Sequence, residues 1–458
     1  MIRRLGRDRV WGRALLARGT AVACLMATAA LADVPTWVDA RATLQAQAFQ
    51  QALLPGVPGV VAPMPLALPF TTTGFLRFGG LDLPGAPDTL SGEVAAWGRV
   101  GPRDGLLGDG DVTTAWAQYR SGPWRVKLGR QVTWPGSARY VRFDGVSGGA
   151  TFGRFDLDAY VGFVALPRWS LPRGAWVLGS IGEALEDPRL REAQNRAGQF
   201  LLGARAGVKF GQTIRGSLAF HEQHDDIGVA YRVLSADVGS QPVDWMGLGA
   251  RAAFDVKSLG FSEARVWADV TGWRFATASV DYSYQSPSLL LPQTSILAAF
   301  GGASWHELGA ELTVQLPWRM TLTGRGAGQV YDGDRPGGRG LARVKWVPDV
   351  DERWLVQGEL ARVMMGTQGY TQGRLGARYR ATSTITGALD SALYVYDAPI
   401  HGVSSSLTGI ASCEWAITPW LRTMLSTTLM STPYAAFEVQ GLGRLVVELE
   451  PNSTGGRP

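Results

Sequence analysis

The chain has 458 residues, more than a single hydrophobic core normally organises, so several domains or one large closed architecture are expected. Its formal net charge is +5, but residues 1–32 hold six arginines and one aspartate. Subtracting them from the 44 basic and 39 acidic residues leaves 38 of each. This balance gives no support for a nucleic-acid partner.

The first 32 residues are typical of a secretory signal peptide. Arginines occur up to Arg18, an apolar stretch follows over Thr20–Leu31, and the small residues Ala30 and Ala32 precede Asp33 as in a cleavage site. The apolar stretch is shorter than the roughly 20 residues that a membrane-spanning helix needs. The sequence therefore predicts export and removal of residues 1–32.

Cysteine usage agrees with export. Cys24 lies in the signal peptide, which leaves Cys413 as the only cysteine of the exported chain. A lipid-modified Cys24 is a less favoured alternative, because Ala21 stands where a larger aliphatic residue is usual. The exported chain can form no intrachain disulfide. Another source of stability is therefore expected, such as full closure of a β-sheet.

Residues 33–68 precede the repetitive part of the chain and are predicted to form a separate N-terminal segment. Val38–Leu54 is rich in Ala, Gln and Leu, a helical composition. Leu54–Pro69 is apolar and rich in proline, which disfavours a central strand. We expect this segment to be a periplasmic lead-in or a partial plug of a lumen.

Residues 69–450 alternate between apolar and polar side chains, which is the period of a β-strand. From Leu308 to Leu316, for example, aliphatic residues alternate with Glu311, Thr313 and Gln315. Such runs approach the roughly 9–11 residues of a tilted membrane strand, whereas soluble strands cluster near about 5–6. We therefore predict an all-β fold: a closed antiparallel transmembrane β-barrel of about 18 or 20 strands, within a range of roughly 16–22. Residues 451–458 would be a C-terminal tail.

The two faces of the predicted strands differ in chemistry. One carries Ala, Gly, Val and Leu, which tolerate lipid, and the other carries Arg, Asp, Glu and Gln, which a water-filled lumen can hold. Tryptophans gather near strand ends, where interfacial girdles fall. Short connections, assigned to the periplasm, alternate with longer ones, assigned to the outside. The predicted pore-lining residues are Arg125, Lys127, Asp156, Asp158, Arg215, Glu263, Asp269, Glu311, Arg374, Arg378, Arg380 and Glu438. An equally weighted alternative is that these charges only pair with one another to solvate the wall.

One predicted hairpin carries a more specific pattern. Gly129-Arg130-Gln131 ends its first strand, Ser137-Ala138-Arg139 lies in the loop, and Phe143-Asp144-Gly145 begins its second strand. This arrangement resembles a hairpin of the alginate-export and related porin-type outer-membrane barrels. The resemblance implies a barrel whose lumen carries arginines that guide an anionic solute. Barrels of that kind usually end on an aromatic residue, whereas this chain continues past Leu449 to Pro458.

Two further segments are candidates for function. The long connection Leu166–Ala197 is predicted either to fold inward as a constriction or to remain an external flap. Its candidate constriction residues are Glu183, Glu186, Asp187, Arg189 and Arg191. His221 and His224 have a spacing that metal ligands use, but no third ligand is identifiable, and a solvated turn is the favoured interpretation.

The leading functional hypothesis is an outer-membrane channel for passive passage of small hydrophilic solutes. The alternatives are export of an anionic polymer and a structural or adhesive surface barrel without transport. No catalytic residue, metal or cofactor is predicted, and the chain is not expected to be an enzyme, because no histidine obviously pairs with a serine. The expected partners are outer-membrane lipid, the outer-membrane assembly machinery and the solutes, with the oligomeric state open.

Overall fold

The computed structural model describes residues 37–52, 64–67, 70–82, 89–100, 109–133, 141–165, 199–211, 213–225, 228–290, 303–333, 335–365, 368–433 and 437–449. Within these ranges the protein consists of 23 β-strands, a four-residue helix, α4 (Pro287–Leu290), and a single 3-10 turn, η3 (Pro317–Arg319). No helix in the described ranges is long and apolar enough to cross a membrane.

The strands are, in chain order, β1 (Trp37–Ala52), β2 (Met64–Ala67), β3 (Phe70–Asp82), β4 (Thr89–Val100), β5 (Asp109–Ser121), β6 (Trp124–Thr133), β7 (Val141–Phe152), β8 (Phe155–Val164), β9 (Phe200–Phe210), β10 (Ile214–His224), β11 (Val229–Val243), β12 (Met246–Asp255), β13 (Gly260–Trp273), β14 (Ala276–Gln285), β15 (Trp305–Leu316), β16 (Met320–Tyr331), β17 (Arg335–Trp346), β18 (Trp354–Met365), β19 (Gln368–Arg380), β20 (Ile385–Ile400), β21 (Val403–Thr418), β22 (Leu421–Ser431) and β23 (Phe437–Leu449).

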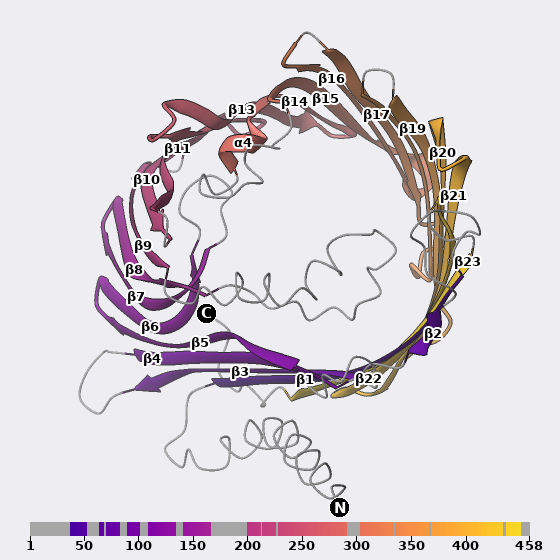
Figure 1. The fold of residues 1–458 in the computed structure, drawn as a ribbon, viewed down its shortest axis with the longest axis horizontal. Coiled ribbons are helices and arrows are strands. Elements are labelled where there is room, and N and C mark those ends of the chain that lie inside the picture. The colour runs from indigo at the N-terminus through magenta and orange to yellow at the C-terminus, as the bar shows by residue number, and fades with distance from the viewer. Residues whose placement is uncertain are drawn as a thin grey trace, which may run out of the picture.

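All the strands belong to one sheet. From β3 to β23 each strand pairs antiparallel with the next one in the sequence, and β1 pairs with β23 and with β3. The strands therefore follow one another around a ring (Figure 1). The short β2 pairs only with β1, through Phe49 and Gln51, at the edge that β3 also uses.

The N-terminal segment and the strand number differ from the sequence prediction. The helical composition of Val38–Leu54 favoured a segment outside the sheet, but β1 covers most of this stretch. Its alternation of alanines with Asp39, Arg41 and Thr43 fits a strand, and hydrogen bonding to partners on both edges outweighs helix propensity. With β1 and the four-residue β2 included the described sheet has 23 strands, more than the 18 or 20 favoured by the sequence.

The strand ends define two rims. One rim, here called the short-turn rim, holds tight connections such as Gly122–Pro123 and Gly153–Arg154. The other, here called the long-loop rim, holds the connections that include 166–198 and 291–302, together with some short turns. On the long-loop rim, β20 and β21 are joined by a two-residue turn at His401 and Gly402. Both turn residues have positive φ, as a tight hairpin of this kind requires.

The predicted alternation of faces is present in the strands. In β15 the Glu307 side chain is almost fully buried, whereas its neighbour Leu308 is 61% exposed and Leu312 is 47% exposed. The less exposed phase carries the polar side chains, and these contact one another across two or more strands, as side chains on a concave surface do. We refer to this phase as the inner face and to the apolar phase as the outer face.

Candidate functional site

The inner face carries a continuous row of polar and small side chains. Its members face one another in register from β8 to β16, because each antiparallel pair aligns residues of the same phase. The row consists of Asp156, Gly207, Ser217, Asp237, Arg251, Arg265, Ser283, Glu307 and Gln329. Such a row provides hydrogen-bonding groups around much of the ring.

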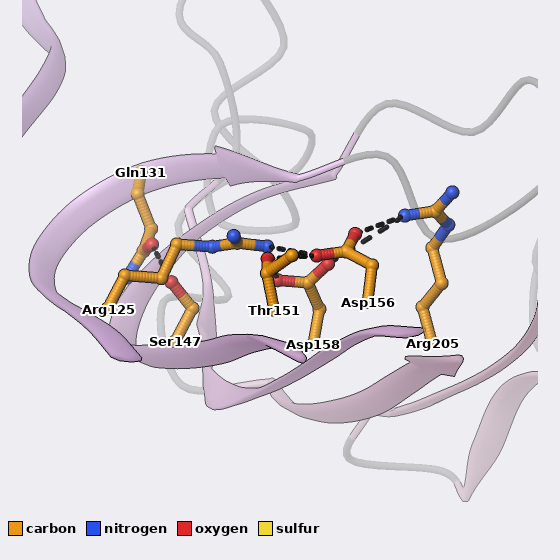
Figure 2. A network of polar contacts seen from close by, with 7 residues as sticks. All are labelled: Arg125, Gln131, Ser147, Thr151, Asp156, Asp158 and Arg205. Carbon is orange, nitrogen blue, oxygen red and sulfur yellow. Dashed lines mark hydrogen bonds and ion pairs between the residues drawn. The ribbon is translucent and has the colours of Figure 1, made fainter. Parts of the chain in front are cut away.

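A first ion-pair network joins β6, β8 and β9 (Figure 2). The Arg125 guanidinium contacts the carboxylates of Asp158 and Asp156, with an Nη2–Oδ1 distance of 3.4 Å to Asp156. Arg205 Nη1 lies 3.3 Å from Asp156 Oδ2 and 3.8 Å from Asp158 Oδ2. Thr151 Oγ1 donates to Asp156 Oδ1 at 2.9 Å. Two guanidiniums thus share two carboxylates on one patch of wall.

A glycine makes this network possible. Gly149, on β7, stands in register between Arg125 and Asp158. A Cβ atom at Gly149 would lie 2.4 Å from Asp158 Oδ1 and 2.7 Å from Arg125 Nε. The missing side chain therefore leaves the space through which the arginine reaches across β7.

A second network extends from β13 to β17. Asp281 accepts Arg325 Nη2 at 2.9 Å and lies 3.5 Å from Arg265 Nη2. Glu307 accepts Gln329 Nε2 at 2.6 Å, lies 3.4 Å from Arg325 Nη2 and contacts the Arg339 guanidinium. Further pairs continue around the ring, namely Arg343–Glu359 at 2.6 Å, Arg374–Asp390 at 2.8 Å and Arg422–Glu448.

The two partners of these pairs are not equally exposed. Arg339 is 49% exposed while Glu307 is 4% exposed, and Arg343 is 49% exposed against 17% for Glu359. In every inner-face pair described from β13 to β20, the arginine is more exposed than its carboxylate partner. The carboxylates are recessed against the wall and the guanidiniums stand in front of them. The surface presented to the inside is therefore richer in positive charge than the sequence composition suggests.

The structure brings together some of the predicted pore-lining residues. Arg125, Asp156 and Asp158 meet in the first network, Glu263 pairs with Arg251, and Arg374 pairs with Asp390. Lys127 Nζ lies 4.1 Å from the ring centroid of Trp116, Arg380 donates to the Asp351 carbonyl at 2.5 Å, and Gln440 donates to Glu438. The remaining predicted residues occupy inner-face positions outside these pairs, and they are Arg215, Asp269, Glu311 and Arg378.

The histidine candidates do not form a metal site. His221 and His224 were expected in a loop, but both lie on β10, where residues three apart point to opposite faces. His221 is buried on the inner face, with Nδ1 2.8 Å from the Tyr160 hydroxyl, whereas His224 Nε2 is 2.5 Å from Glu222 on the outer face. The described residues contain no group of three or more His, Cys, Asp or Glu arranged to hold a metal.

The hairpin motif has a structural explanation. Gly129 faces Gly145, and the Arg130 guanidinium donates two hydrogen bonds of 2.7 Å to the Asp144 carboxylate opposite. Gln131 Nε2 donates to the Gly145 carbonyl at 3.1 Å. Arg130 also donates to the Val112 carbonyl at 3.0 Å, at a level where β5 and β6 no longer pair. The motif therefore fixes the register of β6 and β7 and ties them to β5.

Several members of the networks escaped sequence reasoning. Arg205, Asp281 and Arg325 lie on the polar phase of their strands, and that phase was the available signal. What the sequence could not supply was the strand order and register that pair them. The candidate constriction residues Glu183, Glu186, Asp187, Arg189 and Arg191 lie outside the described residues, as do the predicted signal peptide and C-terminal tail.

No family model and no curated protein matches the chain. Solved structures do resemble it. The P pilus usher (PapC) translocation pore has 9% sequence identity and a TM-score of 0.47, over 90% of this chain and 99% of that chain. The outer membrane protein OpdK from Pseudomonas aeruginosa has 11% identity and a TM-score of 0.39, over 90% and 99%. Pseudomonas aeruginosa OccK2 has 12% identity and a TM-score of 0.42, over 91% and 100%. The likeness covers most of the chain with few identical residues.

Proposed function

We propose that the ring of strands is a closed barrel that spans the bacterial outer membrane as a channel for small hydrophilic solutes. The observation that carries the proposal is the division of the wall into an apolar outer face and an ion-paired inner face. Leu308, Leu389 and Leu425 are each more than 60% exposed on the outer face. An apolar surface this extensive is suited to lipid, while soluble monomers expose patches of only a few hundred Å².

The backbone pairing supports the same placement. In hydrocarbon every backbone N–H and C=O needs an internal partner, which a ring of paired strands supplies. In the described strands the pairing continues through β1 to both β23 and β3. With this many strands, wall side chains alone do not fill the interior, so a path for water and solutes is expected.

The recessed carboxylates suggest which solutes pass most readily. A solute inside the ring meets the guanidiniums of Arg339, Arg343 and Arg374 before it meets their partners, because the arginines are the more exposed members. Charged groups that line a pore favour ions of opposite sign. We therefore expect the channel to prefer anions, although the exported chain has balanced charge.

Conductance in a planar bilayer tests this proposal. Refolded protein should give single-channel currents, and the reversal potential in a KCl gradient should correspond to anion preference. Arg343→Gln combined with Arg374→Gln should shift that potential toward the value of an unselective pore. Arg362→Gln is the matched control, because Arg362 forms an equivalent ion pair with Asp397 on the outer face. Folded protein without conductance would overturn the channel, and cation preference would overturn the selectivity.

A further inference from the structure

Leaving aside Cys413 and the tyrosines, the outer face of β9–β23 carries ionisable side chains only near the long-loop rim in the described residues. These side chains lie within the last four strand positions at the long-loop rim. We call them the outer collar, and its members are Glu222, His224, Arg232, His306, Arg362 and Asp397. The other outer-face positions of these strands are apolar, small or hydroxyl-bearing. The collar therefore places charged groups near the long-loop end of the apolar outer face.

The collar contains two well-formed ion pairs on widely separated strands. Arg232, on β11, donates to both Glu222 oxygens, at 2.7 Å and 3.0 Å. Arg362, on β18, donates to both Asp397 oxygens at 2.6 Å and to Thr371 Oγ1 at 3.2 Å. Both arginine side chains remain 40% exposed, and a guanidinium has five N–H donors, so donors remain for a further ligand.

The short-turn rim, opposite the collar, carries exposed tryptophans. Every exposed tryptophan of the described residues lies at or near the short-turn rim: Trp124, Trp245, Trp273, Trp318, Trp346, Trp354, Trp415 and Trp420. Tryptophan is the residue that favours the interface between hydrocarbon and ordinary lipid headgroups. The short-turn end of the outer face thus carries the exposed tryptophans and the long-loop end carries the paired charges, a difference that fits two leaflets with different headgroups.

We propose that the outer collar binds phosphate-bearing headgroups of the lipids that surround the long-loop rim, together with the divalent cations that bridge those headgroups. This proposal rests on the membrane placement proposed above. A guanidinium recognises phosphate oxygens through paired N–H donors, and carboxylate oxygens are preferred ligands of Mg²⁺ and Ca²⁺. Exposed ion pairs add little stability by themselves. Their recurrence at one level of an otherwise uncharged surface is explained by a ligand that carries both phosphate and cation.

The experiment compares full-length protein refolded into vesicles of phosphatidylcholine with protein in vesicles that also contain a bis-phosphorylated glucosamine-disaccharide lipid. The readout is the temperature at which β-structure is lost, with Mg²⁺ or with a chelator. We expect the phosphorylated lipid with Mg²⁺ to raise this temperature. Arg232→Gln combined with Arg362→Gln should remove most of the rise, and the Arg→Lys pair of variants should retain part of it.

The matched control is Arg343→Gln combined with Arg374→Gln, which breaks two ion pairs of similar geometry on the inner face. These variants should keep the full rise. An equal rise in the outer-collar variant, no rise in the wild type, or the same rise from inorganic phosphate and Mg²⁺ in plain vesicles would overturn the lipid assignment. Conductance in pure phosphatidylcholine, expected to be the same for wild type and outer-collar variant, reports separately on the channel.

Discussion

The two faces of a single strand show how one sheet meets two environments. On β15, Leu308 and Leu312 of the outer face stand exposed, whereas Glu307 of the inner face is held by Arg325 of β16 and Arg339 of β17. Apolar contacts on the outer face are non-directional, so one apolar residue can replace another. Glu307 on the inner face depends on specific partners one and two strands away. Specificity of pairing therefore resides mainly on the inner face.

The largest effect is expected from placing a charge on the outer face. Leu312→Arg should destabilise the membrane-embedded protein by about 2–4 kcal/mol if Leu312 lies near the middle of the bilayer, because a cation is poorly solvated by lipid. Thr313→Arg should be tolerated, since Thr313 lies on the inner face, where its Oγ1 is 3.0 Å from Thr323 Oγ1. Urea unfolding from vesicles measures both values. Equal costs at the two positions would show that the faces are assigned wrongly.

Alternation alone was enough to predict these two faces. The pattern at Leu308–Leu316, with polar residues between aliphatic ones, indicates which face each residue occupies, because side chains of a strand point alternately to opposite sides. Composition misled at Val38–Leu54, where alanine, glutamine and leucine carry helix propensity and the decisive strand partners are β3 and β23. Propensity is local, whereas the hydrogen bonds that decided the outcome are long-range.

The candidate site was only partly predictable for a related reason. The polar phase identified Arg125, Asp156 and Asp158 as inner-face residues, but their meeting depends on Gly149 of the intervening strand. The favoured interpretation of His221 and His224 as part of a solvated turn was wrong, because both lie on strand β10. Which residues face inward can be read from the period of two, while which of them touch depends on register, and register is set by strands distant in the sequence.

A smaller effect is expected from adding a methyl group where backbones approach closely. Gly129 has φ +110°, and a Cβ there would lie 2.2 Å from the Ala115 carbonyl oxygen of the neighbouring strand. Gly129→Ala should therefore cost roughly 1–3 kcal/mol through backbone strain.

The control for this prediction is Gly324→Ala. A Cβ at Gly324, on the outer face of β16, would meet no atom within 4 Å. Its substitution should change the unfolding free energy by less than about 0.5 kcal/mol. If the two alanine variants unfold at the same urea concentration, the close approach of β5 and β6 at Gly129 is not present in the folded protein.

The smallest effect is expected in a turn that belongs to neither face. In the connection between β17 and β18, the backbone N–H of Trp354, together with that of Arg353, holds the pKa of Asp349 below its ordinary value of 3.8. A lowered pKa contributes stability that is present above pH 3.8 and is lost as the pH falls through the folded-state value. Asp349→Asn should lower the unfolding midpoint slightly at neutral pH. The difference from wild type should shrink in acid, and a difference independent of pH would contradict this origin.

The position of β1 has a consequence for the order in which the protein is assembled. β1 is the first described strand of the chain, yet Leu44 faces Leu445 of the last one as well as Thr72 of β3. The pairing with β3 is local and can form early, but the other edge of β1 has no partner until β23 has been made. Pairing between distant segments is slow, and an unpaired edge is a template for wrong pairing. The interval between the release of β1 and the arrival of β23 is therefore when the chain depends most on being shielded from other strands.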